Sequence, residues 1–154
     1  MVTLGERGYV EAARTILTAA RAVSDGVAAL SAGRDSQLCL YGAPDLSVVA
    51  FGAKPGAPLN IYNVNDAMSA KGWNLNVMQN PACMHLCVTF ANAARAEEFV
   101  RDLAEAELDV RTAPKGKYAD GSGAIYGLAA SIPDKSLVGE VCFSFLDSLY
   151  KVPA

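Results

Sequence analysis

One tyrosine, Tyr126, stands in a stretch of small residues that runs Asp120-Gly-Ser-Gly-Ala-Ile-Tyr-Gly-Leu-Ala-Ala-Ser131. A core tyrosine normally has branched apolar neighbours that lock its ring, and this stretch supplies few of them. Gly123 and Gly127 permit backbone conformations and close approaches that a β-carbon would obstruct. A phenol in such a loop can donate a charge-assisted hydrogen bond to a phosphate or carboxylate oxygen. The pattern indicates a ligand contact, with tight packing of the loop against another element as the alternative.

The four cysteines, Cys39, Cys83, Cys87 and Cys142, form no C-x-x-C pair. Cys83 and Cys87 flank His85, but the stretch ACMHLCVTF alternates like a strand and strings the three side chains along one face. A tetrahedral zinc site usually takes its ligands from turns and needs a second ligand pair, which this sequence lacks. Buried reduced thiols are expected, and no metal site.

The sequence contains few other residues or motifs typical of catalysis. His85 is the only histidine and has no nucleophile motif around it, so a sheet-face histidine is expected rather than a general base. No G-x-S-x-G, Walker loop or H-E-x-x-H occurs. The stretch GSGAIYG follows no strand pattern and has the wrong spacing for a dinucleotide-binding loop. Most acidic residues lie along expected helix faces, where solvation explains them. No catalytic residue is assigned within this chain.

The composition sets limits on the class of protein. A chain of 154 residues with 52% hydrophobic and 19% charged residues is expected to form one globular domain. Its net charge of -3 and lack of a Lys/Arg cluster argue against a nucleic-acid partner. The apolar runs are too short to span a membrane and no signal sequence opens the chain, so the chain is expected to be soluble.

Periodicity predicts the elements that must position the tyrosine loop. A long helix is expected over 1–33, because apolar residues recur at alternating steps of four and three. The region 34–112 is expected to hold a sheet and helices. Strand patterns occur in SQLCLYG, LSVVAFG, WNLNVMQ and CMHLCVTF, and Asn60 and Asn92 are expected to cap two helices.

The last part of the chain divides into a loop and a helix. The segment 113–130 has no strong period and is expected to be a glycine-rich active-site loop, and 131–151 a C-terminal amphipathic helix. The short connections favour an antiparallel or mixed sheet of about four strands covered by helices on one face. The fold class predicted from this order is α+β, in a single domain.

Five stretches of the sequence are informative together. They are GERGYVEAARTILTAAR, GAPDLSVVAFG, AMSAKGWNLNVMQNPACMHLCVTF, GSGAIYGLA and FLDSLY. In this order and spacing they resemble the carboxy-terminal portion of the sphingosine-1-phosphate lyase family. The two most specific blocks are Lys71-Gly-Trp-Asn-Leu-Asn76 and Gly123-Ala-Ile-Tyr-Gly127, and the resemblance runs from about Gly5 to Tyr150.

The resemblance implies the small carboxy-terminal domain of a pyridoxal-phosphate enzyme of fold type I. Such lyases cleave a phosphorylated long-chain (sphingoid) base by a retro-aldol reaction into phosphoethanolamine and a fatty aldehyde. In the family the cofactor forms a Schiff base with a lysine that directly follows a histidine, in a large domain that precedes this region. The family also implies a homodimer.

The chain departs from the family at that lysine, because none of its six lysines follows His85. The resemblance therefore implies an excised domain that lacks the large domain, is inactive alone and binds no cofactor alone. Residue by residue, it carries over Tyr126, which is similar to a tyrosine that handles the substrate phosphate. Gly123 and Gly127 would support the position of this ring.

Two other hypotheses stay open from the sequence. One is a free-standing, non-catalytic binding or regulatory module of the same fold. The other is the small domain of a pyridoxal-phosphate amino-acid decarboxylase, whose ligand carries a carboxylate rather than a phosphate. Localisation is not determined by the sequence; the cytoplasm, or the cytosolic face of the endoplasmic reticulum for a eukaryotic parent protein, fits the resemblance.

Overall fold

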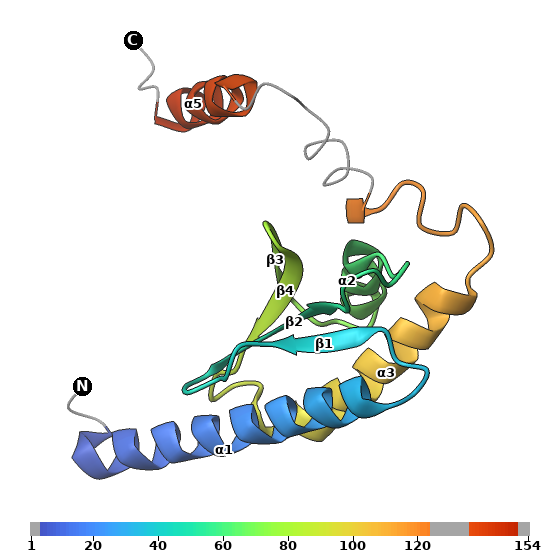
Figure 1. Ribbon diagram of the computed structural model, residues 1–154. Helices are drawn as coiled ribbons and strands as arrows, with labels where there is room; N and C mark the ends of the chain where they lie inside the picture. Colours follow the sequence, from blue (N-terminus) through green and yellow to red (C-terminus); the bar gives the residue numbers. More distant parts are fainter. Residues whose placement is uncertain (1–3, 124–135, 151–154) are drawn as a thin grey trace.

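The structure is a computed structural model that describes residues 4–123 and 136–150. Helices and strands follow in an order that confirms the predicted α+β class (Figure 1). The elements are α1 (Gly5–Ala32), β1 (Leu38–Tyr41), β2 (Val48–Ala53), α2 (Ile61–Ala70), β3 (Asn76–Gln79), β4 (Ala82–Cys87), the 3-10 helix η1 (Ala93–Arg95), α3 (Ala96–Thr112) and α5 (Ser136–Tyr150).

The four strands form one sheet in the order β1-β2-β4-β3, and every neighbouring pair is antiparallel. Phe51 of β2 lies opposite Leu40 of β1 and Met84 of β4. Because side chains alternate along a strand, Val49 and Phe51 point to the same face. The expected sheet is confirmed, and it is antiparallel rather than mixed.

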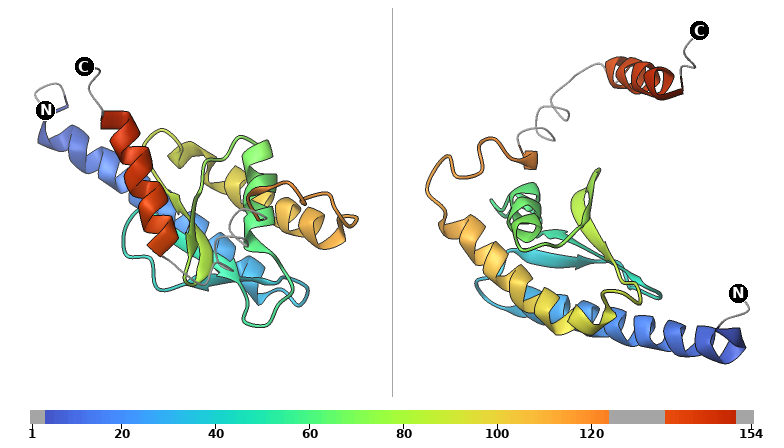
Figure 2. Two further views of the ribbon diagram at one scale, coloured as in Figure 1. Left: turned by 90° about the horizontal axis from the view of Figure 1, so that it is seen from above. Right: turned by 180° about the vertical axis from the view of Figure 1, so that it is seen from behind.

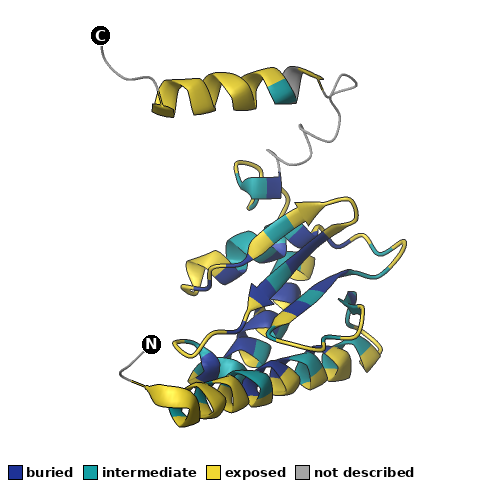
Figure 3. Cartoon of the chain, turned by 90° about the vertical axis from the view of Figure 1, so that its left-hand side faces the viewer, coloured by how far each residue is buried: buried dark blue, intermediate teal, exposed yellow. Residues whose placement is uncertain are grey.

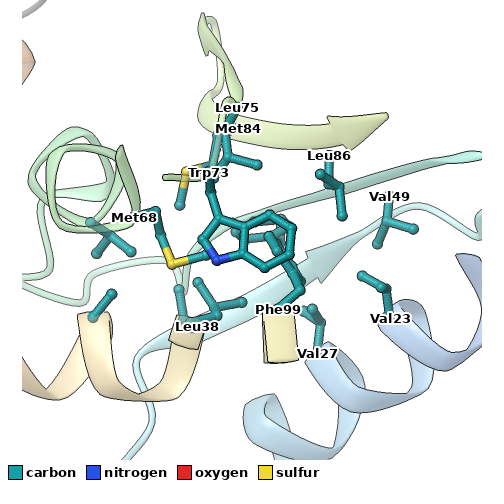
Figure 4. Close-up of a cluster of buried hydrophobic side chains, with 14 of the residues drawn as sticks. Val23, Val27, Leu38, Val49, Met68, Trp73, Leu75, Met84, Leu86 and Phe99 are labelled. Atoms are coloured by element: carbon teal, nitrogen blue, oxygen red, sulfur yellow. The ribbon is translucent and has the colours of Figure 1, made fainter. Parts of the chain in front are cut away.

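The core lies between one face of this sheet and helices α1, α2 and α3 (Figures 2 and 3). Phe99 of α3 is fully buried at its centre, with its ring edge-on to Phe51 at 5.9 Å and to Trp73 at 5.0 Å (Figure 4). Such T-shaped pairs add to the stabilisation from burial alone. This aromatic cluster holds the first turn of α3 against the sheet and the turn after α2.

Only part of the apolar stripe on α1 is covered. Ala20, Val23 and Val27 are buried against the core, whereas Tyr9 and Val10, nearer the start of the helix, are about half exposed. Each apolar side chain left in water forgoes the roughly 1.5–3 kcal/mol that full burial provides. The first turns of α1 therefore carry apolar surface that the described part of this chain does not cover.

Of the two expected helix caps, one is confirmed and one is wrong. The Asn60 side chain accepts a hydrogen bond from the Tyr62 amide at 3.0 Å, as an N-cap of α2 should. Asn92 precedes η1 without a capping bond. Its side chain accepts from the Thr89 amide at 2.8 Å and donates to the Cys87 carbonyl at 3.1 Å, which closes the turn after β4 instead.

Helix α5 lies apart from the sheet and the other helices (Figure 1). Its large apolar side chains are exposed, among them Phe143, Phe145 and Leu149. No helix within the described residues is both long enough and apolar enough to cross a membrane.

Candidate functional site

The predicted site falls only partly within the described residues. Tyr126 and Gly127 lie outside them, and Gly123 is the last described residue before the gap. Gly123 is buried against the first turn of α2, where a β-carbon would overlap the side-chain amides of Asn63 and Asn60. At this position the missing side chain makes room for α2, so close approach of the backbone explains the glycine.

The neighbouring Ser122 is bound to α2 through Asp66. The Ser122 amide donates to Asp66 Oδ2 at 2.9 Å, and its hydroxyl donates to Asp66 Oδ1 at 2.6 Å. The same hydroxyl lies 3.2 Å from the Tyr62 carbonyl. Both oxygens of one carboxylate therefore hold one residue of the loop. A β-carbon on Gly121 would overlap Asp66 Oδ2, so the residue before Ser122 must also be small.

A second carboxylate holds the loop a few residues earlier. Asp109 of α3 accepts from Lys117 Nζ at 2.6 Å and from the Tyr118 hydroxyl. Lys117 and Tyr118 together keep the pKa of Asp109 below its usual range. Burial, followed by the bond to Asp109, raises the pKa of Tyr118 to about 12. The loop that precedes Tyr126 thus has one contact with α3 and one with α2.

The space beside these contacts forms a cleft of about 430 Å³ between α2, α3 and the loop, with Asp66, Lys71 and Tyr118 in its lining. A larger cleft of about 860 Å³ lies between α1 and the start of α3 and is lined by Arg14 and Phe90. Its lining includes no residue of the loop, so the larger cleft does not belong to the predicted site.

A third carboxylate, Asp102 of α3, lies in the core and not on a solvated face. Trp73 Nε1 donates to Asp102 Oδ2 at 2.8 Å, and Lys71 Nζ lies 3.5 Å from its other oxygen. The Arg95 guanidinium stacks over the Trp73 ring at 4.1 Å. The bond from Trp73, with the positive charge of Lys71, keeps the pKa of Asp102 below its usual range. Asp102 is only 8% exposed.

Glu107 of α3 is likewise buried, which corrects its expected place on a solvated face. It accepts hydrogen bonds from the Ser36 hydroxyl, at 2.9 Å, and from the Gln37 amide, and so holds the start of β1. The apolar stripe of α3 gave a usable signal for Asp102, because that residue follows Phe99 by three positions and precedes Leu103 directly. The partner of Asp66 gave no such signal, since it lies 56 residues along the chain.

Three of the four described lysines serve as structural contacts. Lys54 Nζ donates to the Ser36 carbonyl at 2.6 Å, Lys71 Nζ lies 2.6 Å from Glu105, and Lys117 is bound to Asp109. The hydrogen bond to Glu105 raises the pKa of Lys71. A lysine that forms a Schiff base must attack as a neutral amine, which these contacts oppose. These three lysines therefore do not fit a pyridoxal-phosphate anchor.

His85, Cys39, Cys83 and Cys87 lie in the sheet as the alternation predicts, whereas Cys142 lies on α5. His85 is half-buried, pairs with Ala50 and Asn76, and lies between the buried Met84 and Leu86. Cys83 is buried and its pKa is raised by burial. The expected burial of the thiols is wrong for Cys87 and Cys142, which are exposed because Cys87 ends β4 at the edge of the core and Cys142 lies on α5, apart from the sheet and the other helices. Among the described residues, no group of three His, Cys, Asp or Glu side chains could hold a metal ion.

Comparison with known proteins gives close relatives that are much longer than this chain. No family model matches. The sphingosine-1-phosphate lyase of Arabidopsis thaliana is 39% identical over 97% of the chain, which covers 26% of that relative. The mouse sphingosine-1-phosphate lyase 1 is 36% identical over 97% of the chain, and the chain covers 25% of it.

A solved structure agrees with the sequence relatives. The sphingosine-1-phosphate lyase of Burkholderia pseudomallei matches 99% of this chain with a TM-score of 0.70 and 26% identity, and the chain covers 28% of it. The chain thus spans about a quarter of the length of the relatives it matches. In sequence and in fold, this chain is similar to one part of the sphingosine-1-phosphate lyases, and the resemblance drawn from its motifs is confirmed.

Proposed function

We propose that the chain is the carboxy-terminal domain of a sphingosine-1-phosphate lyase, here called the parent lyase. The parent lyase cleaves a phosphorylated sphingoid base to phosphoethanolamine and a fatty aldehyde. One observation supports this most: the alignment with the Arabidopsis lyase covers 97% of this chain but only 26% of that lyase. A single domain aligned with a larger enzyme that contains it gives these two values.

The cofactor of the parent lyase is pyridoxal phosphate, which acts as an electron sink during cleavage of the carbon–carbon bond. Lys54, Lys71 and Lys117 are held by a carbonyl oxygen or by carboxylates, and none of the six lysines of this chain follows its histidine. The residues of this chain do not fit the cofactor, so a large domain outside these 154 residues holds it. The chain alone is inactive.

Within the parent lyase, this chain contributes Tyr126 to the binding of the substrate phosphate. A phenolic hydroxyl donating to a phosphate oxygen forms a charge-assisted bond, which is stronger than a neutral one. Gly123 supports this arrangement by lying close against α2, which leaves Tyr126 three residues from a buried position. Gly127 is proposed to support the tyrosine as well, because glycine permits backbone conformations that a β-carbon would obstruct.

The test of this role is Tyr126→Phe in the parent lyase. Loss of one hydrogen bond to a charged phosphate costs about 1.5–3 kcal/mol, a loss of roughly tenfold to a hundredfold in kcat/KM. Steady-state cleavage of a phosphorylated sphingoid base measures it, with an aromatic amino acid supplied as a decarboxylase substrate in parallel. Unchanged kinetics would remove Tyr126 from the site, and turnover of the amino acid alone would remove the lyase assignment.

Cofactor binding by the chain alone has its own test. The 154-residue chain is mixed with pyridoxal phosphate and treated with borohydride, which reduces a Schiff base to a stable adduct. Only scattered, substoichiometric labelling is expected by peptide mass spectrometry. Stoichiometric trapping at a single lysine would show that this chain holds the cofactor itself.

The parent lyase is proposed to be a homodimer, and the isolated chain to self-associate. The exposed apolar residues at the start of α1 and along α5, Tyr9, Val10, Phe143, Phe145 and Leu149, support the second statement, because exposed apolar patches favour association. Light scattering at increasing concentration measures the mass. A monomer throughout would contradict the expected self-association.

A further inference from the structure

The segment 121–123 makes an ordered set of contacts along α2. Asn60, Asn63 and Asp66 are spaced by three residues and share one face of that helix. Gly121 and Ser122 lie against Asp66, and Gly123 lies against Asn63 and Asn60. The loop therefore runs back along α2 toward the start of the helix, and Asp66 makes the bonds that fix its register.

These contacts are polar and specific. Ser122 gives both its amide hydrogen and its hydroxyl hydrogen to the two oxygens of Asp66, at 2.9 and 2.6 Å. Hydrogen bonds to a charged carboxylate are worth more than neutral ones. Gly121 and Ser122 are half-buried and belong to no apolar cluster, so the position of the loop depends on the carboxylate and not on burial of side chains.

Because the chain is continuous, the contacts of residues 121–123 with α2 also limit the position of Tyr126. Tyr126 follows Gly123 by three positions in the sequence, and an extended chain spans at most about 3.3–3.6 Å per residue. Their Cα atoms therefore lie within about 11 Å of each other. A contact that fixes Gly123 on α2 therefore limits how far from that helix the third residue after it can lie, and loss of the contact relaxes this limit.

We propose that Asp66 is a positioning residue, which holds residues 121–123 on α2 and through them sets the place of Tyr126 in the parent lyase. This inference rests on the proposed function for its effect on catalysis. The contact between Asp66 and Ser122 itself is testable in the 154-residue chain alone.

The first experiment measures amide hydrogen exchange at Ser122 by NMR in the 154-residue chain. Asp66→Ala should make the Ser122 amide exchange at least about tenfold faster, because its acceptor is lost. The matched control is Asp109→Asn, which removes the other carboxylate that holds the loop and should leave Ser122 unchanged. Equal Ser122 exchange in wild type and Asp66→Ala would overturn the proposal.

A steric variant tests the same contact without removing the carboxylate. Gly121→Ala places a methyl group where Asp66 Oδ2 lies and should accelerate Ser122 exchange as Asp66→Ala does. Gly139→Ala on α5 is the matched glycine control, because its β-carbon meets no atom within 4 Å. Unchanged Ser122 exchange in Gly121→Ala would contradict the close approach of the loop to α2.

The second experiment is a double-mutant cycle in the parent lyase. Asp66→Ala should lower kcat/KM about tenfold in the wild-type background and cause no further loss in Tyr126→Phe, because Asp66 acts through the tyrosine. Full additivity would assign Asp66 a role in general stability and overturn the inference. Unchanged kinetics of Tyr126→Phe would instead refute the proposed role of Tyr126 in the parent lyase, while the exchange result for Ser122 would still stand.

Discussion

Two aspartates of this chain hold two different segments by different means. Asp102 binds Trp73 inside a core where Phe99 and Phe51 are fully buried, so apolar packing and the polar bond support the same position. Asp66 binds Ser122 in a half-buried place where the apolar core does not reach. The apolar core supports the contact of Asp102, whereas the contact of Asp66 depends on polar bonds.

The difference separates the rigid part of the domain from the part proposed to meet the substrate. A segment held by packing moves only if the core opens, whereas a segment held by a few polar bonds opens locally at lower cost. The first kind suits a scaffold. The second suits a loop that carries a binding residue and whose position depends on one or two side chains.

The largest effect is expected in the core. Phe99→Ala should lower the free energy of unfolding by about 3–5 kcal/mol, because it empties the space between Phe51 and Trp73. Urea unfolding followed by the fluorescence of Trp73, the single tryptophan, measures it. The matched control is Phe90→Ala, whose ring is 65% exposed and which should change the free energy little. Equal effects of the two variants would refute the described core.

Asp102→Ala should have the next largest effect, about 1–3 kcal/mol, because the buried Trp73 indole N–H loses its acceptor. The exposed Asp25 on α1 provides the control, since Asp25→Ala should leave the unfolding midpoint unchanged. The same urea titration applies to both variants. If Asp102→Ala matched the control, Asp102 would not be part of the core.

The lowered pKa of Asp102 also predicts that the free energy of unfolding depends on pH. Its pKa is lowered in the folded protein, so its contribution is fully present above the unfolded value of about 3.9 and is lost as the pH falls through the lower folded value. The difference in unfolding free energy between wild type and Asp102→Asn should therefore shrink below about pH 4. A difference that stays constant into strong acid would contradict the charged state of Asp102.

The smallest effect concerns Tyr118 in the loop. Its pKa is raised to about 12, so the contribution of the protonated phenol is present below about pH 10 and is lost as the pH rises toward 12. Tyrosinate absorbance during an alkaline titration should lose a group that ionises near pH 12 in Tyr118→Phe, whereas Tyr41, whose pKa is also raised by burial, still ionises late. An unchanged titration near pH 12 in that variant would assign the value of about 12 to another tyrosine.

Much of the fold was predictable because it depends on local pattern. The alternation in the four strand segments and the stripe on α1 identified the elements, and the cap at Asn60 was predicted from its residue type and place. Asn92 was predicted wrongly, because the same residue type can also close a turn, and only the neighbouring Thr89 amide and Cys87 carbonyl decide between these uses.

The site was predictable only in part. The small residues around Tyr126 indicated a special loop, but they did not show that Gly121 and Gly123 make room for α2. Buried carboxylates were also missed, because an acid in a helix is solvated unless a donor reaches it from elsewhere. For Asp102 that donor is Trp73, which lies 29 residues away.

The sequence by itself determined the order and type of the elements, the absence of a histidine–lysine pair and the resemblance to sphingosine-1-phosphate lyases. Each of these depends on residues close together in the chain or on short sequence motifs. Only the tertiary structure decided which acids are buried and that Asp66 holds Ser122. Contacts between residues 56 positions apart depend on how α2 and the loop pack, and that packing leaves no local periodic trace.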